Sequence, residues 1–260
     1  MTFRERYPVA WEYHRNTERR RLGGALPAAV DVHADPPKEI PLAPYVALPA
    51  PDPVSMPFGE AVARRLSCRR FRTSPTAGAA LSTLLWNAYA FGPSLPVGSI
   101  EFRERPVPSA GALYPLELYV VARHVEDVDP GVYHYASVTH GLELVRDVAV
   151  PGGLLTGLFM GQHYVEGAGA VLVITCEPER SLKKYGDRGY RYVLLEAGHV
   201  AQNVNLTAAA LGLGAYNVGG FFDDELARLL MVDEDREVPL YAVAIGVPEE
   251  GDRTELRSPQ

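Results

Sequence analysis

A long segment from Tyr190 to Leu211 constrains the fold more than any other feature of this sequence. Apolar side chains recur along it at helical spacing and cover much of its circumference. The segment also contains small residues, among them Gly198 and the alanine run 208–210. A helix that is apolar nearly all round is buried, and small residues let another helix approach closely. The sequence therefore predicts a buried helix capped by Gly212, and a dimer interface is one way to bury it.

Shorter patterns on either side of this helix predict an α+β domain. The expected helices are 57–66, 78–91 and 224–231, and the expected strands are 116–122, 170–176 and 238–247, with 131–135 and 142–145 paired as a hairpin. Helices and strands do not alternate as they do in a doubly wound fold, which makes α+β the better fold class.

Nine prolines lie between residues 23 and 57. Because proline fixes φ and removes a backbone donor, we expect this segment to be extended and at a surface. Two interpretations stay open: a disordered leader, or an arm packed against the body or a second subunit. We divide the chain into a proline-rich N-terminal arm, 1–57, and a domain, 58–260, and expect regular structure to start after the arm.

Composition and charge exclude several classes of function. A net charge of −7 argues against general binding to nucleic acid or membrane surfaces. Cys68 and Cys176 are too far apart for a metal-ligand motif, and no metal site is expected. The first ten residues lack the apolar run of a signal peptide, and no stretch is long enough to cross a membrane. A cytoplasmic protein is the default expectation.

Arg65, Ser67 and Arg69 form the first candidate site. In an extended segment these alternating residues point to one side. Two guanidinium groups and a hydroxyl on one side make a good phosphate grip, because arginine offers forked donors to paired oxygens. The alternative is a solvated arginine-rich helix end, which the helix dipole favours in any case.

Two glycine-containing segments suggest backbone that lies close to a ligand. The first, Pro108–Pro115, brackets small residues and Ser109 between prolines, although taken alone a tight turn into the next strand is the simpler explanation. The second contains Gly219 and Gly220. Its approximate G-x-G-x-x-G pattern fails as a dinucleotide fingerprint, since Asn217 occupies the last glycine position and the segment follows a helix.

Lys184 and Tyr185 precede the long helix, where polar side chains can lie at the rim of a pocket. Either can accept or donate a proton when its surroundings shift its pKa. Glu196 and His199 form a Glu-x-x-His pair within the helix. A di-iron site needs two such copies, and we instead expect a hydrogen-bonded pair in the core.

Taken in order, these segments resemble the nitroreductase superfamily, specifically its SagB/thiazole-oxidase-type branch, the azoline oxidases. The resemblance covers roughly residues 58–247 and rests on R-x-S-x-R-x-F at 65–71, PSAGALYPLELYVV at 108–121, GVYHY at 131–135, KYGDRGYRYVLLEAGHVAQN at 184–203 and the Gly-Gly-Phe loop at 219–221. It implies a nitroreductase-like fold, with a central, mainly antiparallel sheet flanked by helices, and a homodimer that holds FMN at its interface.

The resemblance also implies roles for individual residues. Arg65, Ser67 and Arg69 would bind the FMN phosphate and ribityl chain. The segment Pro108, Ser109, Ala110 and Gly111 would lie over the flavin from the partner subunit, and Gly219 and Gly220 would lie near its reactive N5. Lys184 and Tyr185 match the acid/base pair of the azoline oxidases. Arg253 or Arg257 would complete the phosphate site.

The function implied is FMN-dependent oxidation of azoline rings to azoles in a peptide or peptide-derived substrate, with a cyclodehydratase as a possible partner. The chain departs from the oxidases of modification complexes because it is short and its arm is too small to be a peptide-binding domain. Two alternatives stay open: an NAD(P)H-dependent reductase of nitro compounds or quinones, and a flavin-binding scaffold subunit of a heterocycle synthetase.

Overall fold

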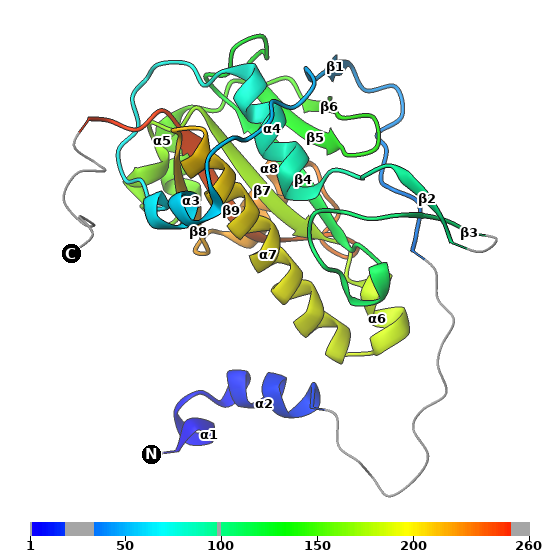
Figure 1. Ribbon diagram of the computed structural model, residues 1–260. Helices are drawn as coiled ribbons and strands as arrows, with labels where there is room; N and C mark the ends of the chain where they lie inside the picture. Colours follow the sequence, from blue (N-terminus) through cyan, green and yellow to red (C-terminus); the bar gives the residue numbers. More distant parts are fainter. Residues whose placement is uncertain (1, 19–33, 98–99, 251–260) are drawn as a thin grey trace, which may run out of the picture.

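A computed structural model describes residues 2–18, 34–97 and 100–250 of the chain. Its centre is a seven-stranded sheet in the order β1-β6-β5-β4-β7-β9-β8, in which every neighbouring pair is antiparallel (Figure 1). The strands are β1 (Tyr45–Ala47), β4 (Leu116–Ala122), β5 (Gly131–Ala136), β6 (Gly141–Arg146), β7 (Ala170–Cys176), β8 (Gly214–Val218) and β9 (Val238–Gly246). A separate hairpin consists of β2 (Ser94–Val97) and β3 (Ile100–Arg103). The predicted α+β class with a central antiparallel sheet is confirmed.

Helices cover both faces of this sheet, which explains why its central strands are apolar throughout. Alternate residues of β4 point to opposite faces. Leu118 and Val120 join a core with α4 (Gly78–Tyr89) and α7 (Arg188–Ala210), and Tyr119 and Val121 join a second core with α5 (Gly152–Leu158) and α8 (Asp223–Leu230). Every residue of β4 and β7 is buried.

The long helix α7 is only partly buried within one chain. Val193, Ala197 and Val200 lie in the core, but Leu194 is 42% exposed and Leu195 is 62% exposed. The expectation of burial all round is therefore wrong for the single chain, because one side of the helix faces away from the sheet. The helix ends as predicted, with Gly212 at φ 76°, a left-handed conformation that glycine adopts without steric cost.

Regular structure begins before residue 57, contrary to expectation. Helices α1 (Phe3–Arg6) and α2 (Pro8–Asn16) occupy the N-terminus, and β1 extends the sheet beside β6. The capping box of Thr2 and Glu5 starts α1, and Pro8 is the first residue of α2, a position that suits proline. Arg188 at the start of α7 donates a hydrogen bond of 3.0 Å to the carbonyl of Thr17 and so ties α2 to the domain.

Two short α-helices, α3 (Phe58–Arg64) and α6 (Glu179–Tyr185), and two 3-10 turns, η1 (Ala110–Ala112) and η2 (His163–Val165), complete the described chain. Helix α6 leads directly into α7 through Gly186. None of the described helices is long and apolar enough to span a membrane.

Candidate functional site

The predicted phosphate grip lies in extended chain that runs beside β8. Helix α3 ends at Arg64, and Arg65 already has an extended conformation with ψ 113°. Ser67 bridges to Ala215 of β8, and the amide of Cys68 donates to the carbonyl of Ala215 at 2.9 Å. Cys68 is buried while Ser67 and Arg69 are exposed. Ser67 and Arg69 thus flank the buried Cys68 as the alternation predicts, whereas Arg65 and Leu66 are both half-buried.

A chain of side-chain contacts links this grip to the paired glycines after β8. The Arg69 guanidinium lies 5.9 Å from the ring centroid of Tyr164, whose ring is 5.1 Å from that of Tyr216. The Tyr216 hydroxyl donates to Gln162 at 3.3 Å, and the Gln162 amide donates to the carbonyl of Gly220 at 3.1 Å. A Cβ on Gly220 would lie 3.3 Å from that amide nitrogen. The two motifs thus share one surface along β8.

The serine loop, residues 108–115, has an unusual backbone. Gly111, Ala112 and Tyr114 have φ values of 65°, 52° and 45°. Residues with a Cβ rarely adopt positive φ values. They keep them where several surrounding contacts hold the backbone in place. One such contact is internal, because the Ser109 hydroxyl accepts a hydrogen bond of 3.0 Å from the amide of Tyr114.

Lys184 and Tyr185 pack against this loop within the same chain. A Cβ on Gly111 would lie 2.6 Å from the Tyr185 hydroxyl and 3.1 Å from Lys184 Nζ. A side chain at position 111 would displace the ends of Tyr185 and Lys184, and the positive φ of this residue favours glycine. Tyr185 also packs edge-on against Tyr192, with ring centroids 5.1 Å apart. The serine loop and the Lys184–Tyr185 pair thus form one cluster.

The grip and the Lys184–Tyr185 pair lie near opposite ends of α7. Lys184 and Tyr185 end α6 immediately before α7 begins. The grip lies near the other end, where Cys68 and Leu66 adjoin Asn205 and Ala209. Since α7 has 23 residues, it spans about 35 Å. The proton-transfer candidates and the phosphate grip of one chain are therefore separated by most of the length of α7.

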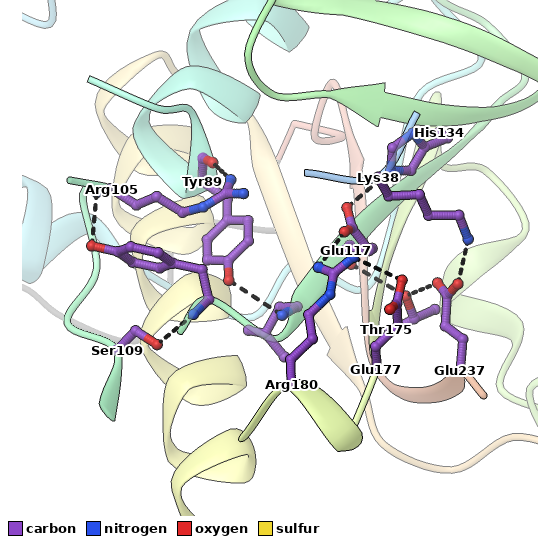
Figure 2. Close-up of polar contacts among 12 residues, drawn as sticks. Lys38, Tyr89, Arg105, Ser109, Glu117, His134, Thr175, Glu177, Arg180 and Glu237 are labelled. Atoms are coloured by element: carbon purple, nitrogen blue, oxygen red, sulfur yellow. Dashed lines mark hydrogen bonds and ion pairs between the residues drawn. The ribbon is translucent and has the colours of Figure 1, made fainter. Parts of the chain in front are cut away.

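Helix α6 is anchored by a buried ion network that the sequence analysis missed (Figure 2). Arg180 donates to Glu117 at 2.6 Å and to Glu177 at 2.8 Å. Glu117 lies 3.0 Å from His134 Nε2, and Glu143 lies 2.8 Å from His134 Nδ1. Burial raises the pKa of Glu117, but the hydrogen bond and charge of His134 and those of Arg180 outweigh burial and lower it to about 2. Glu117 is therefore a buried carboxylate at neutral pH.

The arm extends this network to the outer side of α6. Lys38 forms an ion pair with Glu237, which also accepts a 2.6 Å hydrogen bond from Thr175. Asp35 pairs with Lys183 of α6 at 2.6 Å. Burial opposes the charge on His134, yet the hydrogen bonds and charges of Glu117 and Glu143 raise its pKa above the ordinary value. One sequence signal was present, since Glu117 and His134 interrupt otherwise apolar strands.

The expected Glu196–His199 core pair is wrong. Glu196 is buried, whereas His199, three residues further along α7, is exposed. Glu196 instead accepts a 2.7 Å hydrogen bond from the Tyr89 hydroxyl. Residues three positions apart are neighbours on the surface of a helix. Here α4 covers Glu196 through Tyr89 and leaves His199 exposed. Arg253 and Arg257 lie outside the described residues.

Comparison with known proteins assigns the family. Residues 62–247 match the model of the nitroreductase family. The protein MJ1384 of Methanocaldococcus jannaschii, provisionally named a nitroreductase, is 39% identical over 196 residues, 75% of this chain and 93% of its own length. The microcin B17-processing protein McbC of Escherichia coli is 32% identical over 171 residues, which cover 64% of this chain and 60% of McbC.

Solved structures agree with this assignment. A structure from Anabaena variabilis, described as a nitroreductase, superposes with a TM-score of 0.66 at 27% identity and covers 80% of this chain and 42% of that chain. A chain of the E. coli microcin synthetase complex McbBCD superposes with a TM-score of 0.60 over 96% of this chain and 95% of that chain, and at 24% identity it establishes the shared fold. On the match over residues 62–247 and these likenesses, the chain belongs to the nitroreductase family.

Proposed function

We propose that this protein is an FMN-dependent oxidoreductase that dehydrogenates azoline rings to azoles in a peptide or peptide-derived substrate. The observation that carries the proposal is the packing of Gly111 against Lys184 and Tyr185. Both side chains are of types that can transfer a proton, and both lie against the glycine of the serine loop. Similarity to McbC, whose name states that it processes microcin B17, supports a peptide substrate.

The grip fits the phosphate of FMN. Ser67 and Arg69 are exposed on either side of the buried Cys68, and Arg65 is half-buried. Together they would offer two cationic forks and a hydroxyl to the phosphate. Gly219 and Gly220 follow β8 directly and, without side chains of their own, would let the flavin ring lie against the backbone. When bound, FMN supplies the two-electron acceptor, with molecular oxygen as the final oxidant.

Lys184 and Tyr185 would remove the proton from the substrate ring. Both lie in partly buried positions at the end of α6, and the buried Arg180 of the same helix fixes its orientation through Glu117. A proton acceptor must lie within hydrogen-bond reach of the proton that it removes. The serine loop is the surface against which the substrate would lie within this reach.

We further propose a homodimer, because the grip and the Lys184–Tyr185 pair of one chain lie toward opposite ends of α7. A second copy packed on the exposed side of α7 would cover Leu194 and Leu195 and bring its serine loop over the flavin. Light scattering should accordingly give a mass of about twice 28.4 kDa. A monomer that holds FMN would contradict this arrangement.

The proposal places the enzyme in the cytoplasm, with a cyclodehydratase that forms the azoline as its partner. A second candidate is an NAD(P)H-dependent reductase of nitro compounds or quinones, which the name of MJ1384 favours. A flavin-binding scaffold subunit is a third.

The purified protein should be yellow, release FMN on denaturation and convert an azoline peptide to an azole in air. Flavin reduction by NAD(P)H without azoline oxidation would select the reductase, and enhanced cyclisation by the partner without flavin turnover would select the scaffold.

Replacing Arg69 with alanine should weaken FMN binding by about 1.5–3 kcal/mol, the contribution of a hydrogen bond to a charged group. Fluorescence titration of the apoprotein with FMN measures the change. Arg70→Ala is the matched control, because Arg70 is the adjacent exposed arginine. Its Nε lies 4.0 Å from a carboxylate oxygen of Glu249, whereas Arg69 contacts the ring of Tyr164. Equal losses in both variants would mean that general positive charge, not the grip, binds the phosphate.

A further inference from the structure

A chain of polar side chains runs from α7 to the end of β8. Strands β8 and β9 pair with each other and pack against α7 (Figure 1). Asn205 of α7 is buried, and its amide nitrogen donates to the side-chain oxygen of Asn217 on β8 at 2.9 Å. The Asn217 amide nitrogen in turn donates to the hydroxyl of Tyr241 on β9 at 3.1 Å. A buried asparagine thus orients a tyrosine through Asn217.

The direction of these hydrogen bonds is set at their buried end. The Asn205 amide nitrogen also donates to the carbonyl of Ala201 at 2.6 Å. Because a carbonyl can only accept, both hydrogens of this nitrogen are used, and Asn217 accepts with its oxygen. The nitrogen of Asn217 is therefore turned toward Tyr241, whose oxygen accepts. The hydroxyl proton of Tyr241 remains, and it has no acceptor within the described part of the chain.

This unpaired proton lies next to the two glycines that follow β8. The ring of Tyr241 runs alongside Gly219, since a Cβ on that glycine would lie 3.5 Å from Tyr241 Cε2. Gly219 is exposed and Gly220 is half-buried, and neither amide donates a hydrogen bond to another described residue. Two backbone donors and one phenol donor are thus available at the end of β8. Such donors suit the oxygen and nitrogen acceptors on the polar edge of a planar heterocycle.

We propose that Tyr241 is a cofactor-binding residue: its hydroxyl, oriented by Asn217 and Asn205, donates a hydrogen bond to the polar edge of the flavin ring beside Gly219. The inference rests on the proposed function, because its ligand is the FMN of that proposal. Reduction adds electron density to a flavin ring, and a hydrogen bond to a charged acceptor is stronger than one to a neutral acceptor. The Tyr241 hydroxyl therefore holds reduced FMN more tightly than oxidised FMN.

Tyr241→Phe tests this contact, because it removes the hydroxyl and keeps the ring. Fluorescence titration of the apoprotein with FMN should show a dissociation constant raised by about 3- to 10-fold, the loss of a neutral hydrogen bond. A further loss of about tenfold for the reduced form corresponds to a midpoint potential about 30 mV lower in a two-electron couple. Spectroelectrochemical titration of the bound flavin measures this shift. A purely structural hydroxyl would weaken both redox forms equally and leave the potential unchanged.

Tyr133→Phe is the matched control. It removes a phenol hydroxyl of β5 that donates to the carbonyl of Asp129 at 2.8 Å, toward the other side of the sheet from β8. Its FMN affinity and its potential should equal those of the wild type. Asn217→Ala should weaken FMN binding in the wild type but add little in the Tyr241→Phe background, because Asn217 acts through the Tyr241 hydroxyl.

The outcomes separate this inference from the proposed function. If wild-type protein binds FMN but Tyr241→Phe changes neither affinity nor potential, the inference alone is overturned. Equal effects in Tyr133→Phe, or independent effects of the Asn217 and Tyr241 substitutions, would also overturn it. If FMN binds and the potential shifts but no azoline is oxidised, the proposed reaction fails and the role of Tyr241 stands. Wild-type protein that takes up no FMN would overturn both.

Discussion

Replacing Lys184 with alanine, or Tyr185 with phenylalanine, is expected to lower the rate of azoline oxidation by about 10²–10⁴-fold, the usual contribution of general acid–base catalysis. Both groups lie beside Gly111, where a substrate ring would present its proton. Neither substitution removes a residue of the grip, so flavin occupancy should stay at the wild-type level. Single-turnover reduction of the bound flavin by an azoline peptide, followed by its absorbance, measures the loss.

Lys183→Ala is the control for this experiment. Lys183 is the preceding lysine of α6, but it is exposed and pairs with Asp35 on the outer side of the helix. Its substitution should change the rate by less than about threefold, since an exposed ion pair contributes little. A Lys184→Ala, Tyr185→Phe double variant that oxidises the peptide at a near wild-type rate would show that substrate or solvent supplies the base. Activity only toward nitro compounds with NAD(P)H, indifferent to both changes, would favour the reductase.

Replacing Glu117 with glutamine is expected to lower the free energy of unfolding by about 3 kcal/mol, the lower end of the cost of breaking a buried ion pair. Among the described residues, the buried guanidinium of Arg180 then keeps only the partly exposed Glu177 as an ionic partner. The thermal midpoint of a chain of this size should fall by about 10 °C, as measured by calorimetry. Asp224→Asn, which breaks the exposed Arg228–Asp224 pair of 2.9 Å, is the control and should cost less than about 1 kcal/mol. Equal losses would mean that burial adds nothing to the Glu117 contact.

Acid titration provides an independent check on Glu117. Its folded-state pKa of about 2 lies below the ordinary value of 4.5, so its contribution is complete above pH 4.5 and is lost as the pH falls through 2. The stability difference between wild type and Glu117→Gln should consequently shrink as the pH falls from 5 to 2. A difference that stays constant over this range would contradict the assignment of a low pKa.

Local sequence patterns predicted the parts of the fold that depend on local physics. The apolar runs at 116–122 and 170–176 became the two central strands with unchanged bounds, and the hairpin around His140 formed as expected. The exposure of Ser67 and Arg69 on either side of the buried Cys68 was equally readable, because side-chain direction in extended chain has a period of two. The family resemblance identified the motifs from their order along the sequence, but it did not give their relative positions in the fold.

Contacts between distant segments were not readable in advance. The pairing of Gly111 with Tyr185, and of Arg180 with Glu117, joins residues more than sixty positions apart. Periodicity predicts which side of a helix is apolar but not which neighbour covers it, as His199 demonstrates by facing away from the core. Glu196 looked like one half of a histidine pair, and only its approach to Tyr89 revealed its partner.

The short strand β1 also bears on how the protein avoids aggregation. A bare sheet edge offers unpaired amide and carbonyl groups to any other extended chain. Here three residues of β1, bounded by Pro44 and Pro49, close the edge beside β6, and the parallel bridge from Ser67 to Ala215 interrupts the opposite edge at β8. Proline cannot donate to a further strand. The arm therefore ends the sheet with a short strand flanked by prolines, which disfavours edge-to-edge association of two sheets.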